Sequence, residues 1–264
     1  MISEKPIDFV NPFIGVDGPG NTLCGPYTPF GLVRLGPDCL PPHPTNGYRS
    51  DRPLQGFTHT HVSGTGGEGR FGNLRVMPYL GAPDDIPEGF ERSEEVATVG
   101  IYGVCLSPGN IRVELTSTPR CGICRFYFPE GSEANILIDA CAVHQFHPQR
   151  AAICTNAEIC WTNDKQFEGH GTFRGGWGHN HPYKIFFSGS FNTTPDRILV
   201  GDTDALLEHD HAVGEKAMTV AHFRRSQSIE VRIGVSFVSI PKARDNHDKE
   251  CRSFSFEELT DRHR

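Results

Sequence analysis

Hydrophobic and polar residues alternate along several short stretches of this chain. The segment 110–116 reads NIRVELT, with three aliphatic residues at alternate positions, and the segment 122–128 (GICRFYF) repeats the pattern. Successive side chains of a strand point to opposite faces of a sheet, so this alternation is typical of half-buried strands. Similar patterns predict further strands at 73–79, 135–138, 184–191, 217–223 and 229–238.

These short strands, separated by turn residues, predict an antiparallel β-sandwich over residues 1–242. The chain is rich in the residues that turns require, with 29 glycines and 20 prolines. We find no long amphipathic helix between the strands, which argues against a parallel βαβ sheet. The expected fold class is therefore all-β.

The C-terminal segment carries the signal for a helix start. Ser255 and Glu258 form a capping box, in which each side chain can bond the backbone N–H of the other residue. About nine residues remain before Arg264, too few for a helix that is stable alone. We interpret residues 243–264 as the start of a linker to a further domain. Docking of a short terminal helix onto the sandwich is the alternative.

Composition narrows the function classes. The chain has 264 residues and a formal net charge of −7, without a Lys/Arg cluster, which argues against nucleic acid as a partner. It contains no apolar run long enough to cross a membrane. Nine cysteines and no signal peptide after Met1 favour free thiols and a cytoplasmic location. Cys121 and Cys124 read as packed thiols on opposite sides of a strand, since residues three apart diverge.

Several motifs, in order along the chain, resemble glycoside hydrolase family 92. They are VNPFIG at 10–15, PFGLVRLGPD at 29–38, GFTHTHVSGTG at 56–66, EEVA at 94–97, VELT at 113–116, RFYFP at 125–129 and Gly176-Trp177. Three stretches depart from the family pattern, namely 21–26 (NTLCGP), the Pro-rich stretch before Gly47-Tyr48, and 70–73 (RFGN). These departures leave the sugar and its linkage open.

The resemblance implies the N-terminal domain of a calcium-dependent, inverting exo-α-mannosidase. Its fold would be a galactose-mutarotase-like supersandwich, followed by a linker and an (α/α)6 barrel that carries the general acid, the general base and most calcium ligands. This chain would then shape the sugar pocket, support the barrel and be inactive alone. The implied partners are α-mannoside glycans and the chain's own C-terminal catalytic domain, and no cofactor is expected in this chain.

Candidate site residues cluster in the loops of the first eighty residues. On a strand, His59 and His61 would face the same side, where two imidazoles can bind sugar hydroxyls, a metal or a partner domain, or serve as structural histidines. Trp177 could stack on a sugar or pack in the core. The proposed substrate-binding or interdomain cleft comprises Asn21, Tyr48, His59, His61, Ser63, Gly64, Thr65, Glu68 and Trp177.

Other chemistries receive less support from the sequence. The G-x-G-x-x-G spacing at 64–69 precedes a strand pattern, whereas a dinucleotide site needs a helix there. No carboxylate pair is convincing, so we assign no catalytic and no metal-binding residue. Two alternatives remain: a stand-alone carbohydrate-binding module, and a metalloenzyme that uses His59 and His61.

Overall fold

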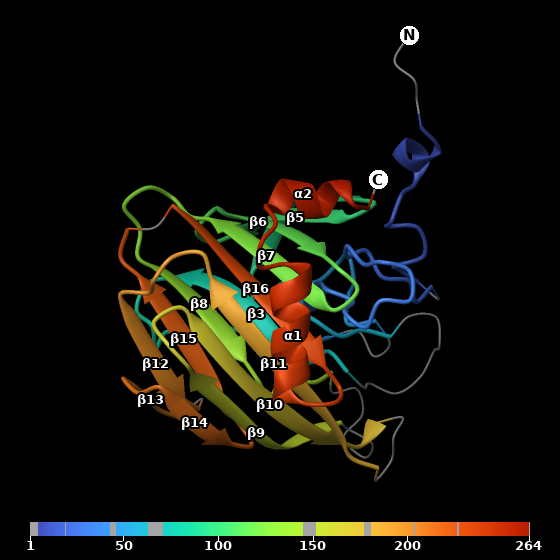
Figure 1. Cartoon of the computed structure of the whole chain (residues 1–264). Helices are drawn as coiled ribbons and strands as arrows, with labels where there is room; N and C mark the ends of the chain where they lie inside the picture. The colour runs from blue at the N-terminus through green and yellow to red at the C-terminus, as the bar shows by residue number, and fades with distance from the viewer. Residues whose placement is uncertain are drawn as a thin grey trace.

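The computed structural model of the chain is an antiparallel β-sandwich with two short helices on its outer surface (Figure 1). It describes residues 5–18, 20–42, 46–62, 71–144, 152–176, 181–202, 204–225 and 227–263. A short 3-10 helix, η1 (Pro6–Phe9), lies in the N-terminal segment. The all-β expectation is confirmed.

Two sheets form the layers of the sandwich. The smaller sheet has the strand order β1 (Gly36–Cys39), β2 (Leu54–Thr58), β3 (Arg75–Leu80), β8 (Ala134–Asp139), β15 (Met218–Phe223), β12 (Arg197–Gly201) and β13 (Leu206–Leu207). The larger sheet has the order β14 (His211–Gly214), β9 (Ile153–Trp161), β10 (Gln166–Arg174), β11 (Tyr183–Phe191), β16 (Ser228–Ser236), β7 (Cys121–Tyr127), β6 (Ile111–Ser117), β5 (Ile101–Ser107) and β4 (Glu91–Thr98).

The core between the sheets is rich in aromatic rings that lie over glycines. In the β10–β11 pair, Phe167 is opposite Gly189, and Gly169 is opposite Phe187. A Cβ on Gly189 would lie 2.5 Å from the Phe167 ring, and one on Gly169 would lie 2.7 Å from the Phe187 ring. Each ring therefore fills the space that the missing side chain of its partner leaves, which stabilises a crowded sheet.

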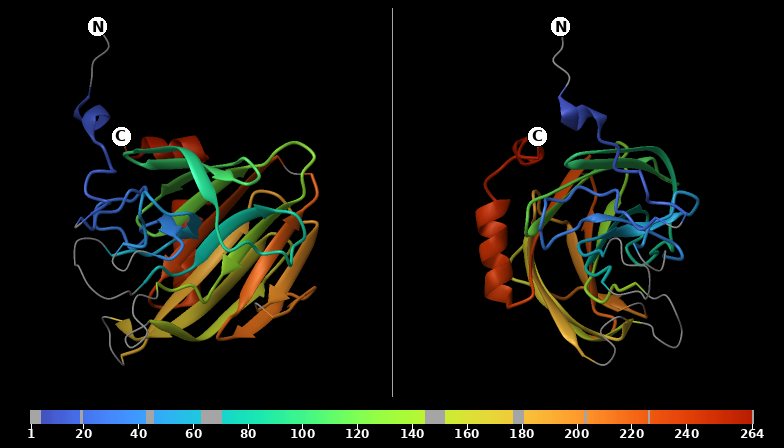
Figure 2. Two further views of the ribbon diagram at one scale, coloured as in Figure 1. Left: turned by 180° about the vertical axis from the view of Figure 1, so that it is seen from behind. Right: turned by 90° about the vertical axis from the view of Figure 1, so that its right-hand side faces the viewer.

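Helix α1 (Ile240–Glu250) packs on the outer face of the larger sheet, against β11 and β16 (Figures 1 and 2). No hydrophobic pattern in the sequence predicts this helix. Ser239 is the N-cap of the helix, and its side chain accepts a hydrogen bond from the Lys242 N–H. A Cβ on Gly234 would lie 2.5 Å from the Ala243 carbonyl oxygen, so this glycine permits the close approach of helix and sheet.

Helix α2 (Phe256–Asp261) begins with the capping box expected for Ser255 and Glu258. It packs its apolar residues on the outer face of β7, where a small cluster comprises Cys121, Ile123, Cys251, Phe256 and Leu259. Cys124 belongs instead to the main core between the sheets. The prediction that Cys121 and Cys124 point to opposite sides is therefore confirmed.

Strands β2, β3 and β8 are neighbours in the smaller sheet. Because they pair antiparallel, the end of β2, the start of β3 and the end of β8 lie at the same end of the sandwich. The chain leading into β1 lies beside them (Figure 2). This arrangement brings together side chains that are far apart in sequence. Among the described residues, no helix is long and apolar enough to cross a membrane.

Candidate functional site

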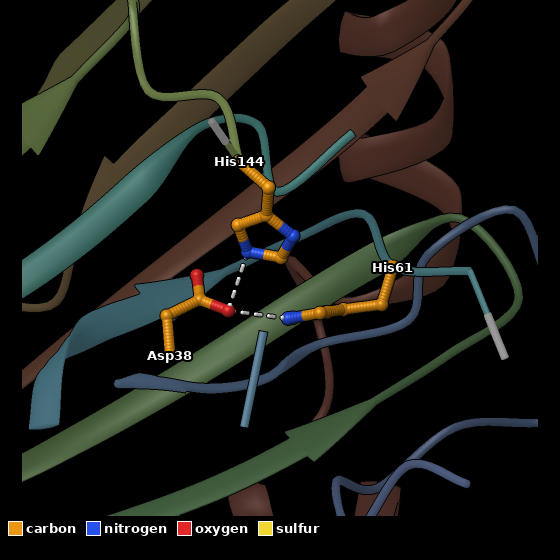
Figure 3. Close-up of side chains that lie close together, drawn as sticks. All are labelled: Asp38, His61 and His144. Atoms are coloured by element: carbon orange, nitrogen blue, oxygen red, sulfur yellow. Dashed lines mark hydrogen bonds and ion pairs between the residues drawn. The ribbon is translucent and has the colours of Figure 1, made fainter. Parts of the chain in front are cut away.

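A buried carboxylate between two histidines marks this end of the sandwich (Figure 3). Asp38 Oδ1 lies 2.8 Å from His61 Nε2 and 2.7 Å from His144 Nε2. Asp38 comes from β1, His61 from the segment after β2, and His144 from the segment after β8. The three residues are only 2%, 6% and 4% exposed, so solvent screens their charges little.

The hydrogen bonds of His61 determine its protonation. Its Nδ1 lies 2.6 Å from the Arg34 carbonyl oxygen and its Nε2 faces the Asp38 carboxylate, so both ring nitrogens must donate. Burial alone would lower the pKa of His61, but the charge and hydrogen bond of Asp38 raise it above its usual value. Burial would likewise raise the pKa of Asp38, but His144 and His61 hold it well below its usual range. The pair is therefore a carboxylate with an imidazolium.

Two glycines make room for the ring of His144. Gly47 and Gly72 have φ angles of +80° and +68°, a region that favours glycine. A Cβ on Gly72 would lie 2.1 Å from the His144 ring, and one on Gly47 would lie 2.5 Å from it. The backbone N–H of His144 also donates to the Phe71 carbonyl oxygen, at 2.8 Å. The ring is thus fixed from several sides.

Asp38 and His144 line a pocket with a volume of about 450 Å³, which is in the range of small-molecule sites. Its other polar lining residues are Gln55, Thr58 and Arg75. Arg75 also donates to the Asp139 carboxylate, at 2.7 Å. Carboxylate, amide, hydroxyl, guanidinium and imidazole groups together offer many donors and acceptors. The pocket can therefore recognise a polyhydroxylated molecule.

His59 lies in the protein interior, with no exposed surface. Its Nδ1 donates to the Leu74 carbonyl oxygen at 2.9 Å, while its Nε2 has no partner among the described residues. Burial lowers the pKa of His59 to about 4, so the ring is neutral at pH 7. Strand β2 ends at Thr58, before both histidines, and among the described residues neither His59 nor His61 lines the pocket. His61 can therefore influence the pocket only through its hydrogen bond to Asp38.

Tyr48 is also buried, and its phenol bonds a different carboxylate. The hydroxyl lies 3.0 Å from both carboxylate oxygens of Glu95, and the Arg92 guanidinium lies 4.8 Å from the centre of the Tyr48 ring. A β-bulge between Ser93 and Val96 accompanies this inward orientation of Glu95. Tyr48 therefore contributes its ring to the support of the loops.

The remaining candidates are placed only in part. Asn21 is half-buried in the segment that precedes β1. Five of the predicted residues lie outside the described part of the chain: Ser63, Gly64, Thr65, Glu68 and Trp177.

Comparison with known proteins identifies the family. The family model described as the glycosyl hydrolase family 92 N-terminal domain matches residues 9–236. The chain belongs to this family.

Solved family 92 structures share the fold. A GH92 α-mannosidase from Bacteroides thetaiotaomicron, in complex with mannoimidazole, is 28% identical with a TM-score of 0.87, and the match covers 98% of this chain and 36% of that one. An inverting GH92 mannosidase from the same bacterium, at 18% identity and a TM-score of 0.77, shares the fold. An uncharacterized secreted glycosidase of Arthroderma benhamiae is 25% identical, over 92% of this chain and 34% of that protein. The chain thus spans about a third of the length of these relatives.

No sequence pattern in this family 92 domain marked Asp38 or His144 as a site residue. Asp38 closes the motif at 29–38, which pointed to the family but not to a site, and His144 belongs to none of the motifs that carry the resemblance. Asp38 is the third of the four residues of β1, and His144 lies five residues after the end of β8, in a connecting segment of the kind that often carries functional groups. Their positions relative to the strands were the one sequence feature that could have indicated a functional role.

The Asp38–His61–His144 cluster does not fit calcium. Calcium takes six to eight oxygen ligands, whereas the cluster offers one carboxylate and two imidazoles. The N···O separations of 2.7 and 2.8 Å are hydrogen-bond distances. Two ligands of a tetrahedral zinc ion would lie about 3.3 Å apart. The geometry is that of a charged hydrogen-bond network.

Proposed function

We propose that this family 92 domain shapes the sugar pocket of a calcium-dependent, inverting exo-α-mannosidase and supports its (α/α)6 barrel. The observation that carries the proposal is the polar pocket beside the Asp38–His61–His144 cluster. The side chains of Gln55, Thr58 and Arg75 add an amide, a hydroxyl and a guanidinium group to the pocket lining, and each can bond a sugar hydroxyl. The solved α-mannosidase at 28% identity supports mannose as the sugar.

The lining of the same pocket indicates that this chain does not hydrolyse glycosides by itself. An inverting glycosidase needs two carboxyl groups about 6.5–9.5 Å apart, with water between them. Among the described residues that line the pocket, Asp38 is the one carboxylate, and its oxygen already accepts from two histidines. We therefore expect the acid and base to come from a barrel domain.

Exposed apolar side chains near the pocket loops support docking of such a domain. Phe237 and Val238 are 43% and 74% exposed, and the Phe237 ring lies 6.3 Å from that of Phe71, just after the glycine-rich stretch. In the N-terminal segment, Phe9, Val10, Ile14 and Phe30 are also at least half exposed. Adjacent exposed apolar side chains, such as those of Phe237 and Val238, favour an interaction face.

A kinetic experiment tests whether hydrolysis requires the barrel domain in addition to this domain. The 264-residue chain alone should give no turnover of an aryl α-mannoside above the buffer blank, whereas a polypeptide that includes a following barrel domain should hydrolyse it. Removal of calcium by a chelator should abolish that activity. Clear turnover by the chain alone would contradict the proposal. Mannose binding by the chain, with no barrel encoded beyond Arg264, would favour a carbohydrate-binding module.

A pocket variant tests the sugar site itself. Gln55 lines the pocket and is only half-buried, so Gln55→Ala should leave the fold intact. Loss of one neutral hydrogen bond, about 0.5–1.5 kcal/mol, should lower kcat/KM of the longer enzyme by up to about tenfold. Gln227→Ala, at an exposed position between β15 and β16, is the matched control and should have no effect. Equal kinetics for both variants would remove Gln55 from the site.

A further inference from the structure

Two cysteines from different strands line one pocket beside the candidate sugar site. Cys141 follows β8 and Cys154 is the second residue of β9, yet both line a pocket of about 360 Å³. Both are partly exposed. Cys141 also lines the 450 Å³ pocket that contains Asp38 and His144. The thiol pair is therefore accessible and lies where the two pockets meet.

We propose that Cys141 and Cys154 form a thiol–disulfide exchange site, which reacts with small disulfides such as oxidised glutathione and closes to an intramolecular disulfide. The inference does not depend on the sugar specificity of the domain.

The chemistry of the two thiols differs in a way that assigns their roles. The neighbouring Cys141 side chain lowers the pKa of Cys154, against the effect of burial. The same interaction, together with burial, raises the pKa of Cys141, whose thiol lies 3.5 Å from the Ala217 carbonyl oxygen. The thiolate is the nucleophile in disulfide exchange, so Cys154 attacks first and Cys141 resolves.

The reaction balances with one oxidant molecule. The Cys154 thiolate attacks one sulfur of the small disulfide, forms a mixed disulfide and releases the other half as a thiolate. Cys141 then loses its proton and attacks the Cys154 sulfur, which releases the second half. Two protein thiols are oxidised and one small disulfide is reduced to two thiols.

Closure would affect the segment that carries His144. The Cys141 N–H donates to Asp139 Oδ1 at 2.8 Å, and the Ala142 carbonyl oxygen accepts from Asn73 Nδ2 at 2.9 Å. Three residues after Cys141, His144 reaches Asp38. A disulfide would tie this segment to β9, so oxidation would alter the wall of the larger pocket.

A second cysteine pair provides a contrast within the same molecule. Cys121 and Cys251 also lie together in one cluster, but their thiols donate to the Asn246 and His247 carbonyl oxygens and neither has exposed surface. Phe256 and Leu259 of α2 cover them. Thiols enclosed in this way do not meet an oxidant while the protein is folded.

Peptide mapping tests the proposal on the complete 264-residue chain. The reduced protein is incubated with oxidised glutathione, quenched with acid and cleaved after Lys and Arg, which yields peptides 126–150 and 151–165. We expect these peptides to be linked, with the linked mass two hydrogens lower than their sum. Because 151–165 contains both Cys154 and Cys160, the Cys160→Ser variant should retain the link. Cys121 and Cys251 should stay reduced in the same sample.

Single variants test the order of attack. The Cys141→Ser variant should accumulate one glutathione on Cys154. In the Cys154→Ser variant, the fraction of Cys141 that carries glutathione should be at least about tenfold lower than the fraction of Cys154 modified in Cys141→Ser. Cys105→Ser, a partly exposed cysteine on β5, should behave as wild type. Absence of the link in folded wild-type protein would overturn the proposal, whether or not the variants fold. Equal modification of the two single variants would overturn the assigned roles.

Discussion

Replacing Asp38 with Asn would remove the charge that His61 and His144 both face. The change keeps the shape, and the amide oxygen can still accept at the position of Oδ1. Two charge-assisted hydrogen bonds become neutral ones, and a hydrogen bond to a charged group is worth about 1 kcal/mol more than a neutral bond. His61 must also give up its buried proton. We expect Asp38→Asn to lower the free energy of unfolding by about 3 kcal/mol, at the low end for a broken buried pair.

A carboxylate elsewhere in the molecule provides a matched control. Glu158 on β9 also lies between two histidines, with its oxygens 3.0 Å from His211 Nε2 and 3.5 Å from His170 Nδ1, but its side chain is 39% exposed. Surface pairs contribute about 0–1 kcal/mol, so Glu158→Gln should change the free energy of unfolding by less than that. Salt should weaken the effect of Glu158→Gln much more than that of Asp38→Asn.

Urea unfolding, followed by far-UV circular dichroism at several pH values, measures both variants. The stabilisation from Asp38, whose pKa is lowered, is present above the unfolded value of about 4 and is lost as the pH falls further. The stabilisation from His61, whose pKa is raised, is complete below about 6.5 and is lost as the pH rises through the folded value. The cost of Asp38→Asn should therefore be largest between about pH 4 and 6.5. A cost equal to that of Glu158→Gln, or one that grows above pH 7, would refute this reasoning.

Two further predictions concern the histidine rings. Burial lowers the pKa of His59 to about 4, so between pH 6.5 and 4 the unfolded chain binds a proton there that the folded chain does not, and acidification over this range should lower the free energy of unfolding by about 3 kcal/mol. The variant His59→Asn, whose amide can still donate to the Leu74 carbonyl oxygen, should show a smaller fall in urea unfolding over the same pH range. An unchanged pH dependence in this variant would count against a neutral His59. Gly72→Ala should lower stability by about 1–3 kcal/mol because of its positive φ, and by a further amount because its Cβ would clash with the His144 ring. The control Gly131→Ala, with φ +76° and nothing within 4 Å of its Cβ, should show only the loss from positive φ in thermal unfolding. Equal losses of stability in the two variants would mean that the His144 ring moves aside.

Alternation revealed strands wherever one face of a strand meets the core. Strand β6 is the clearest case, because Ile111 and Val113 point inward and Arg112 is exposed. Helix α1 was missed for the opposite reason. Its buried residues are Ala243, Asn246 and His247, so no apolar stripe with a period of 3.6 exists. Asn246 Nδ2 donates to the Val235 carbonyl oxygen at 2.8 Å instead. Ser239 followed by Pro241 was the one readable sign of a helix start.

The candidate site could be foreseen only as a region. Described residues between 38 and 75 do line the pocket, and His61 is part of the network beside it. Its partners were not foreseeable by spacing, because Asp38 and His144 are 106 residues apart and meet only when β1, β2, β3 and β8 pair. The same-face expectation for His59 and His61 depends on an extended strand, and β2 ends one residue before His59.

The reciprocal rings and glycines of β10 and β11 also bear on how the sheet reaches the correct alignment. A shift of two residues is the smallest misalignment that keeps the same side chains facing inward. Such a shift would place Phe167 opposite Phe187 or Phe191, and one of the two shifts would place Gly169 opposite Gly189. Both shifts would crowd two rings together, and the second would also leave a void between the two glycines. Each defect would raise the energy of the misaligned hairpin. Size complementarity across this pair thus acts as a proofreading device during folding, which hydrophobicity alone cannot supply.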